Sequence, residues 1–430
     1  MAKRKTQHDI KHEAEAGEPL TPVSPPLRST PDTTDKKSSV EASPTAWSTP
    51  GTAAFDFRSR FSLLQAHGTT NTLIGDTITT PNASMLLAIQ NTTLKDDVYH
   101  EDETTTDFEA YIASRTNHEA ALFVMSGTMG NQLAIRSHLT QIPHSVLCDN
   151  RAHILRAEAG GAASLSQAIV NGVTPSNGVY LTLEDIEKNV VLGDEIHGCP
   201  TKLICLENTL AGTIMPLSEV KRISKFAKEH DIKLHLDGAR LWNAVAAGAG
   251  SLSDYCQEFD SVSLCFSKGL GAPIGSMLVG KKEFIHRARW VRKAIGGGLR
   301  QMGVLTSAAR VAVDENFGKD ANGKDGKLLH SHEVAQMITS IWVQLGGKLA
   351  NPTQTNMVWL DLESAGISNS DFAALGKEKG LKVLSGRLVV HYQISDEAVD
   401  VLEGVMKEVL VKKESISNKK QKTVGKTYYG

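Results

Sequence analysis

The sequence has little of what marks disulfide-rich, membrane or nucleic-acid-binding proteins. Only five of its 430 residues are cysteines, and none has C-x-x-C spacing, which disfavours a disulfide framework or a metal site and favours a reducing compartment. No apolar run approaches the roughly 18 residues of a membrane span. Forty-six basic residues against forty-eight acidic ones lack the basic excess of a nucleic-acid binder. With 40% apolar residues and 36 glycines, the composition is that of a globular protein.

Both ends of the chain differ from the rest. Residues 1–52 mix charges of both signs with many Ser, Thr and Pro, and residues 412–430 are rich in lysine without apolar periodicity. Such segments bury too little apolar surface to repay ordering, so we predict two disordered tails. Acidic residues near the start argue against a mitochondrial presequence, and there is no apolar core of a secretion signal. The expected location is therefore the cytoplasm.

Between the tails, short apolar runs alternate with amphipathic stretches. We expect strands at 120–125, 145–148, 202–207, 233–236 and 261–266, and helices at 129–139 and 217–230. This alternation is typical of an α/β domain with a doubly wound, mostly parallel sheet, here an N-terminal arm and large domain over 53–321. Helices at 332–345 and 371–379 and strands at 357–362 and around 382 and 388 predict a smaller α+β domain over 322–411.

The segment Ser126-Gly127-Thr128 lies where a predicted strand turns into a helix. Free N–H groups and the positive end of the helix dipole suit this position to a phosphate, and the hydroxyls can add donors. Small residues at such a turn can equally serve packing alone. Because the segment is neither G-x-G-x-x-G nor a Walker loop, it does not favour a dinucleotide site.

Two charged residues follow the ends of later strands. An ionised Asp237 at the carboxyl edge of a sheet needs a cation, unless it merely caps the next helix. Lys268, after another apolar strand, would become a nucleophile if burial lowered its pKa, unless it is a solvent-facing loop lysine. A phosphate cup, an acid and an amine at successive strand ends are what pyridoxal 5′-phosphate (PLP) requires.

Ten segments then occur in one order. They are FDFRS (55–59), DTITTP (76–81), DDVYHEDETT (96–105), EAALFVMSGTMGNQLAIRSH (119–138), RAHILRAEAGGAA (151–163), LENTLAGTIMPL (206–217), LHLDGARLWNA (234–244), CFSKGLGAPIGS (265–276), GGGLRQMG (296–303) and RLVVHYQI (387–394). Together they resemble the L-threonine aldolases, with fungal members closest. These are PLP enzymes of the aspartate aminotransferase fold (fold type I), related to the β-eliminating lyases, and the resemblance covers about residues 55–410.

The resemblance implies a role for each matching residue. Lys268 would bond the cofactor as a Schiff base, Asp237 would pair with its pyridine nitrogen, and His153 would stack on the ring and assist proton transfer. Ser126, Gly127 and Thr128 would hold the phosphate with Arg300 of a neighbouring subunit. Arg240, Arg387 and Ser59 would bind the substrate carboxylate, with Arg240 also near the cofactor. This implies a homo-oligomer, a dimer or tetramer, with active sites at subunit interfaces, whose partner is a small amino-acid substrate.

The implied reaction is retro-aldol cleavage of L-threonine or L-allo-threonine to glycine and acetaldehyde. A base, His153 or an ordered water, would take the β-hydroxyl proton. Some bacterial relatives have a histidine after the ENT segment, where this chain has Leu210. The base and the preference between the two substrates therefore stay open.

A second departure lies between Ser59 and Asp76, which are adjacent in the family pattern. Residues 60–75 form an insertion of sixteen residues, which is either a tolerated surface loop or a retained intron.

Three other functions fit parts of the pattern. Another PLP lyase or racemase would share the cofactor residues, whereas a nicotinamide dehydrogenase would need a glycine fingerprint that is missing. A noncatalytic binding protein could use the basic stretch 281–293, although a helix face beside the active site fits it better.

Overall fold

A computed structural model describes residues 69–193 and 195–424, so the predicted N-terminal tail, Ser59 and residues 60–68 lie outside the described residues. The strands are β1 (Ala120–Val124), β2 (Ser145–Asp149), β3 (Ile169–Val173), β4 (Thr201–Glu207), β5 (Lys233–Asp237), β6 (Ser261–Cys265), β7 (Ser276–Gly280), β8 (Leu349–Asn351), β9 (Met357–Leu360) and β10 (Arg387–Val389). The helices before β5 are α2 (Ala83–Gln90), the 3₁₀ turn η1 (Asp97–Tyr99), α3 (Glu103–Thr116), α4 (Gly127–His138), α5 (His153–Arg156), α6 (Gly161–Ser166), α7 (Leu183–Asn189) and α8 (Leu217–Glu229). After β5 come α9 (Leu241–Ala246), α10 (Leu252–Cys256), α11 (Lys282–Ala294), α12 (Gly303–Ala312), the π-helical turn η2 (Val313–Phe317), α13 (Lys327–Gln344), α14 (Asn369–Glu378) and α15 (Asp396–Val424).

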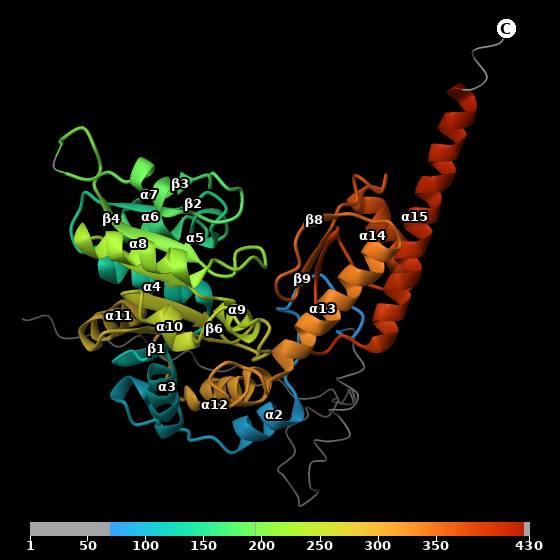
Figure 1. The fold of residues 1–430 in the computed structure, drawn as a ribbon. Helices are drawn as coiled ribbons and strands as arrows, with labels where there is room; N and C mark the ends of the chain where they lie inside the picture. Colours follow the sequence, from blue (N-terminus) through green and yellow to red (C-terminus); the bar gives the residue numbers. More distant parts are fainter. Residues whose placement is uncertain (1–68, 194, 425–430) are drawn as a thin grey trace, which may run out of the picture. The chain divides into compact units, whose positions relative to one another are not determined.

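Seven strands form one sheet in the order β1-β7-β6-β5-β4-β2-β3 (Figure 1). The pairs from β6 to β3 are parallel, and β7 runs antiparallel to both β1 and β6. The predicted α/β class with a mostly parallel sheet is therefore confirmed. Each strand predicted from an apolar run in this part of the chain is present, within two residues at either end.

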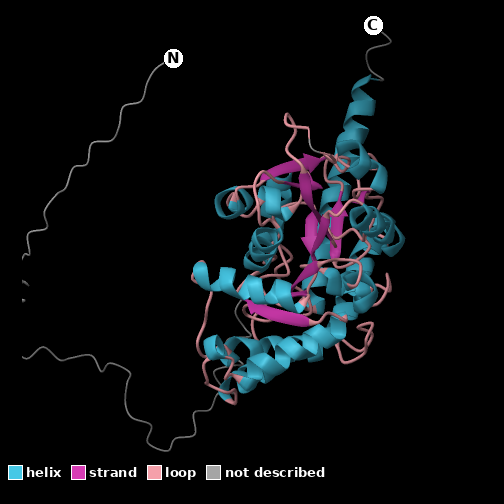
Figure 2. Cartoon of the chain, turned by 90° about the vertical axis from the view of Figure 1, so that its left-hand side faces the viewer, coloured by secondary structure: helices cyan, strands magenta, loops and turns pink. Residues whose placement is uncertain are grey.

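Helices cover both faces of this sheet, and Figure 2 shows strands lying between helices. Along β1, Leu122 and Val124 pack in a cluster with α4 and α11, whereas Phe123 packs into the main core on the other face. In β4, Leu203 and Ile204 divide in the same way between two clusters. Strands covered on both faces are mostly apolar, so they read as near-continuous apolar runs.

A second core lies in the C-terminal part. The antiparallel sheet β10-β9-β8 packs with α13, α14 and α15, which confirms the expected α+β character. Only an isolated bridge between Thr72 and Lys382 stands where a strand around Lys382 was expected. The boundary at residues 321 and 322 stays a prediction.

Helix α15 continues to Val424, beyond residue 412, where a disordered tail was predicted to begin. In Figure 1 it is the long red helix. Within the described ranges, none of the helices combines the length and apolar character that a membrane span requires.

The end of the predicted insertion belongs to the second core. Leu73 is fully buried there, donates its N–H to Lys382 O at 3.0 Å and accepts from Val389 N at 2.9 Å. Thr72 and Leu73 are therefore buried parts of the fold, whereas Asn71 beside them is exposed. In the family pattern the residue before Asp76 is the serine that corresponds to Ser59. In this chain that residue is Gly75, which has no hydroxyl.

Candidate active site

Two acids and a lysine lie at the carboxyl edge of the large sheet. Glu207 ends β4 and Asp237 ends β5, and the two are register partners. In β6, Ser263 is the register partner of Asp237, and Lys268 follows that strand. This is the edge at which open α/β sheets bind ligands.

Asp237 is buried and accepts two hydrogen bonds. Its Oδ2 accepts from Asn131 Nδ2 at 2.7 Å, and its Oδ1 accepts from Ala239 N at 3.1 Å. Helix α9 begins after Arg240 without a side-chain cap, so Asp237 does not cap it. Asp237 therefore lies at the strand-end edge, with its carboxylate held by Asn131 and by the backbone of Ala239.

His153 lies beside a buried carboxylate. Its Nδ1 is 2.8 Å from Glu158 Oε1, and the Glu158 side chain is fully buried. The hydrogen bond to Glu158 raises the pKa of His153 despite partial burial, and the charge of Asp237 adds to this effect. One ring nitrogen of His153, one carboxylate oxygen of Glu158 and one carboxylate oxygen of Asp237 lie within 4.8 Å of one another.

The predicted phosphate cup opens α4. Ser126 is the N-cap, and its Oγ accepts from Met129 N at 3.1 Å. Gly127 and Thr128 follow as the first two helical residues, whose N–H groups have no partner inside the helix. A Cβ on Gly127 would lie only 2.6 Å from Cys265 Sγ, so only glycine fits against the end of β6. The cup and the strand that leads to Lys268 are therefore in direct contact.

Lys268 is partly exposed, and its amine makes no hydrogen bond or ion pair to any residue within the described ranges. Its positive charge acts on Asp76, His153 and Glu207. An unpartnered amine among acids is available for covalent bonding to a ligand.

Arg240 forms a bidentate ion pair with Asp76, Nε to Oδ2 at 2.8 Å and Nη2 to Oδ1 at 2.6 Å. Burial alone would raise the pKa of Asp76, but the charge and hydrogen bonds of Arg240 lower it to about 2. Nε and Nη2 of Arg240, which was predicted to bind the substrate carboxylate, are thus already hydrogen-bonded to Asp76. Nη1 of Arg240 has no hydrogen-bond partner among the described residues.

Arg387 has no acidic partner in the described part of the chain. Its closest polar contacts are weak, Nη1 to Ile74 O at 3.5 Å and Nη2 to Met357 Sδ at 3.7 Å. Burial lowers its pKa, and the charge of Arg240 acts in the same direction. A guanidinium with unfilled donors suits a carboxylate ligand.

Arg300 lies apart from these residues. It pairs with Asp96 at 2.7 Å, and its side chain is half exposed over the ring of Tyr99. Its predicted contact with a phosphate in a neighbouring subunit stays a prediction, as does the role of Ser59.

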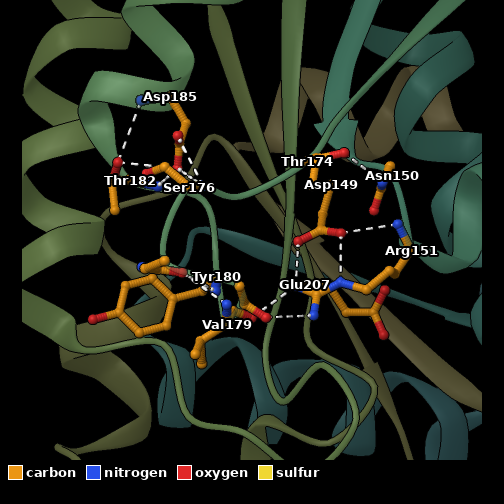
Figure 3. Close-up of polar contacts among 12 residues, drawn as sticks. Asp149, Asn150, Arg151, Thr174, Ser176, Val179, Tyr180, Thr182, Asp185 and Glu207 are labelled. Atoms are coloured by element: carbon orange, nitrogen blue, oxygen red, sulfur yellow. Dashed lines mark hydrogen bonds and ion pairs between the residues drawn. The ribbon is translucent and has the colours of Figure 1, made fainter.

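Asp149 ends β2 and is a third acid at the carboxyl edge of the sheet. Figure 3 shows Arg151 reaching Asp149, with Nη2 to Oδ2 at 2.7 Å, and the same nitrogen donates to Val179 O at 2.8 Å. Glu207 Oε2 accepts from His153 N at 2.9 Å. Burial raises the pKa of Glu207 to about 8, and Asp237 contributes to the rise. Leu210 lines a small cavity beside Glu207.

Sequence reasoning assigned no role to four residues of this constellation, which are Asp76, Asn131, Glu158 and Glu207. Glu207 had a usable signal, because it ends a predicted strand next to the strand of Asp237. The other three lay inside quoted motifs, but only the tertiary structure shows which residue each contacts.

The beta-eliminating lyase family model matches residues 72–365. Three curated relatives are similar over most of their length. The aldolase vrtJ of Penicillium aethiopicum is 54% identical, covering 85% of this chain and 89% of its own. The alanine racemase TOXG of Cochliobolus carbonum is 44% identical, covering 87% and 92%. A probable low-specificity L-threonine aldolase of Schizosaccharomyces pombe is 47% identical, covering 79% and 87%.

Solved structures share the fold at low identity. The threonine aldolase of Leishmania major has a TM-score of 0.67 at 22% identity, covering 79% of this chain and 99% of its own. SPT with bound PLP has a TM-score of 0.61 at 16% identity, covering 80% and 88%. The fold is therefore that of PLP enzymes of fold type I.

Proposed function

The chain belongs to the β-eliminating lyase family, in its low-specificity L-threonine aldolase group, and on that premise we propose that it is a PLP-dependent aldehyde lyase. Its substrates are L-threonine, L-allo-threonine or both, and its products are glycine and acetaldehyde. The observation that carries the proposal is the amine of Lys268, which has no partner among the described residues and whose charge, like that of Asp237, acts on both His153 and Glu207 at the strand-end edge.

The residues present fit the cofactor. Gly127 and Thr128 offer N–H groups to its phosphate, and Asp237 presents a buried carboxylate to its pyridine nitrogen. Lys268 would supply the amine that holds the cofactor covalently, and His153 would lie against its ring. When bound, PLP withdraws electrons from the bonds at the substrate α carbon.

The remaining groups orient the substrate and move one proton. Arg387 and the free Nη1 of Arg240 bind the α-carboxylate and thereby fix the bond between the α and β carbons. His153, or a water that it holds, accepts the β-hydroxyl proton as that bond breaks. The β carbon leaves as acetaldehyde, and the α carbon takes up a proton to give glycine.

A racemase is the second candidate, because TOXG is 44% identical over most of the chain. Both reactions use the cofactor residues, so the site geometry does not distinguish them.

The experiment incubates the purified protein and PLP with L-threonine, L-allo-threonine or L-alanine. We expect acetaldehyde and glycine from one or both hydroxy amino acids, and neither product from a Lys268→Ala variant that still binds the cofactor phosphate. D-alanine formed from L-alanine without acetaldehyde release would replace the aldolase proposal with the racemase. Wild-type acetaldehyde release by the variant would refute the role of Lys268.

A further inference from the structure

The side chain of Asn131 joins the two carboxylates on which the cofactor site rests. It lies buried on α4, one turn beyond the phosphate cup, and its Nδ2 donates to Asp237 Oδ2 at 2.7 Å and to Glu158 Oε1 at 2.8 Å. An amide nitrogen has two hydrogens, and both are engaged here. Asn131 is thus the bridge between the acid on β5 and the acid beneath His153.

A chain of buried donors fixes the orientation of this amide. Because Nδ2 donates twice, Oδ1 is the acceptor, and His235 Nε2 donates to it at 3.1 Å. His235 Nδ1 must then accept from Ser261 Oγ at 2.8 Å, and that oxygen accepts from His138 Nε2 at 2.7 Å. Burial lowers the pKa of His138 to about 3 and that of His235 to about 4, so both rings stay neutral. Every donor in the chain therefore points towards the two carboxylates.

Two carboxylates so close together repel each other when both are ionised. Glu158 accepts two further bonds, from Gln132 Nε2 at 2.6 Å and from His153 at 2.8 Å. Asp237 has only the backbone of Ala239 besides Asn131. The Asn131 amide is therefore the one side-chain donor to Asp237 in the described part of the chain.

We propose that Asn131 is a positioning residue that holds Asp237 and Glu158 together in the geometry that binds PLP, with His235 and Ser261 setting the direction of its amide. The inference rests on the proposed cofactor site but not on the identity of the substrate. Its readout is cofactor affinity, so it does not depend on which amino acid is cleaved.

The experiment measures the dissociation constant of PLP for the apo forms of wild type, Asn131→Ala and Asn131→Asp between pH 6 and pH 8. Loss of a hydrogen bond to a charged group predicts about tenfold weaker binding for Asn131→Ala at every pH. Ser137→Ala is the matched control, because Ser137 is buried on the same helix and its hydroxyl has no partner among the described residues. The control should stay within about twofold of wild type.

Asn131→Asp separates positioning from packing. Its carboxyl faces Asp237 and His235 from β5 and Glu158 from the segment between α5 and α6. When ionised it repels both acids, and when protonated it donates to one of them. We expect binding weaker than that of Asn131→Ala at pH 8 and equal or tighter at pH 6. A purely structural side chain would give two variants with parallel pH profiles.

We call the hydrogen-bond chain from His138 through Ser261 and His235 to Asn131 the relay. If the Asn131 variants fail to fold, two variants on β6 test it. Ser261→Ala breaks the link between His138 and His235, and we expect two- to fivefold weaker PLP binding. Ser263→Ala, on the same strand and with an unpartnered hydroxyl, should bind as wild type does.

The outcomes that overturn the inference are distinct from those that overturn the function. Wild-type affinity in Asn131→Ala, parallel pH profiles, or equal affinities of Ser261→Ala and Ser263→Ala would each refute the relay. Failure of the wild-type protein to bind PLP would refute the proposed function, and the inference with it.

Discussion

Replacing Asp76 with asparagine tests the ion pair that engages Arg240. The Asp76 side chain is fully buried and that of Arg240 is 15% exposed, so the change leaves a guanidinium charge unpaired in a low-dielectric site. The fall of the Asp76 pKa from 3.8 to about 2 corresponds to about 2.5 kcal/mol of stability. Unpairing a buried charge costs about 3–5 kcal/mol. We therefore expect Asp76→Asn to lower the free energy of unfolding at neutral pH by about 3 kcal/mol.

The assay is urea unfolding of both proteins at pH 7, 5 and 4 and towards pH 3. Because the folded-state pKa lies below the unfolded one, the stabilisation by Asp76 is fully present above about pH 5. It is lost as the pH falls towards 2, and about half of it is gone by pH 3. In an Arg240→Gln background, Asp76→Asn should cost less than about 1 kcal/mol, because the charge to be paired is absent. A loss under about 1 kcal/mol in wild type, with no dependence on pH, would refute the reasoning.

Three further predictions concern the roles carried over from the family. Asp237→Asn should weaken PLP binding and turnover together, each about a hundredfold, because the neutral amide cannot hold the ring proton, and spectrophotometric titration with kinetics checks this. If Arg300 completes a neighbour's site, inactive Arg300→Ala and Lys268→Ala chains should regain activity when mixed; no recovery despite proven subunit exchange would mean a self-contained subunit. Ser59→Ala should leave the KM of the full chain within about twofold of wild type, because residues 60–75 separate Ser59 from Asp76, and steady-state kinetics check this; deleting residues 60–75 removes the fully buried Leu73 and should lower the free energy of unfolding by about 2–5 kcal/mol, which urea unfolding measures.

The sheet was predictable because each of its inner strands is covered on both faces and therefore mostly apolar. Asp237 and Lys268 were predictable for a related reason, since a charged residue directly after such a run is conspicuous. The partner of Arg240 was not predictable, because Asp76 lies 164 residues away and local sequence carries no record of that pairing. Nor was the burial of Leu73, whose neighbours in the second core come from the other end of the chain.

The relay through Asn131 illustrates the same limit at short range. Its amide and the Glu158 carboxylate are 27 residues apart and both lie in quoted motifs. Sequence periodicity places Asn131 on a helix but does not show which strand end that helix faces. The helix also continues past residue 412, where the sequence is rich in lysine, and lysine is a residue that favours helices.

The position of Leu73 has a consequence for how the protein is made. Asn71, two residues earlier, donates to Gly380 O across 309 residues of chain. At about 5–20 residues per second, a ribosome needs about 15–60 s to synthesise that interval. During this time the large sheet can form, but the nascent chain holds Leu73 without the core that will bury it. A product that terminates before α14 lacks Phe372, Leu388 and the later residues of the second core, so it leaves Leu73 with only part of the cover that it has in the full chain.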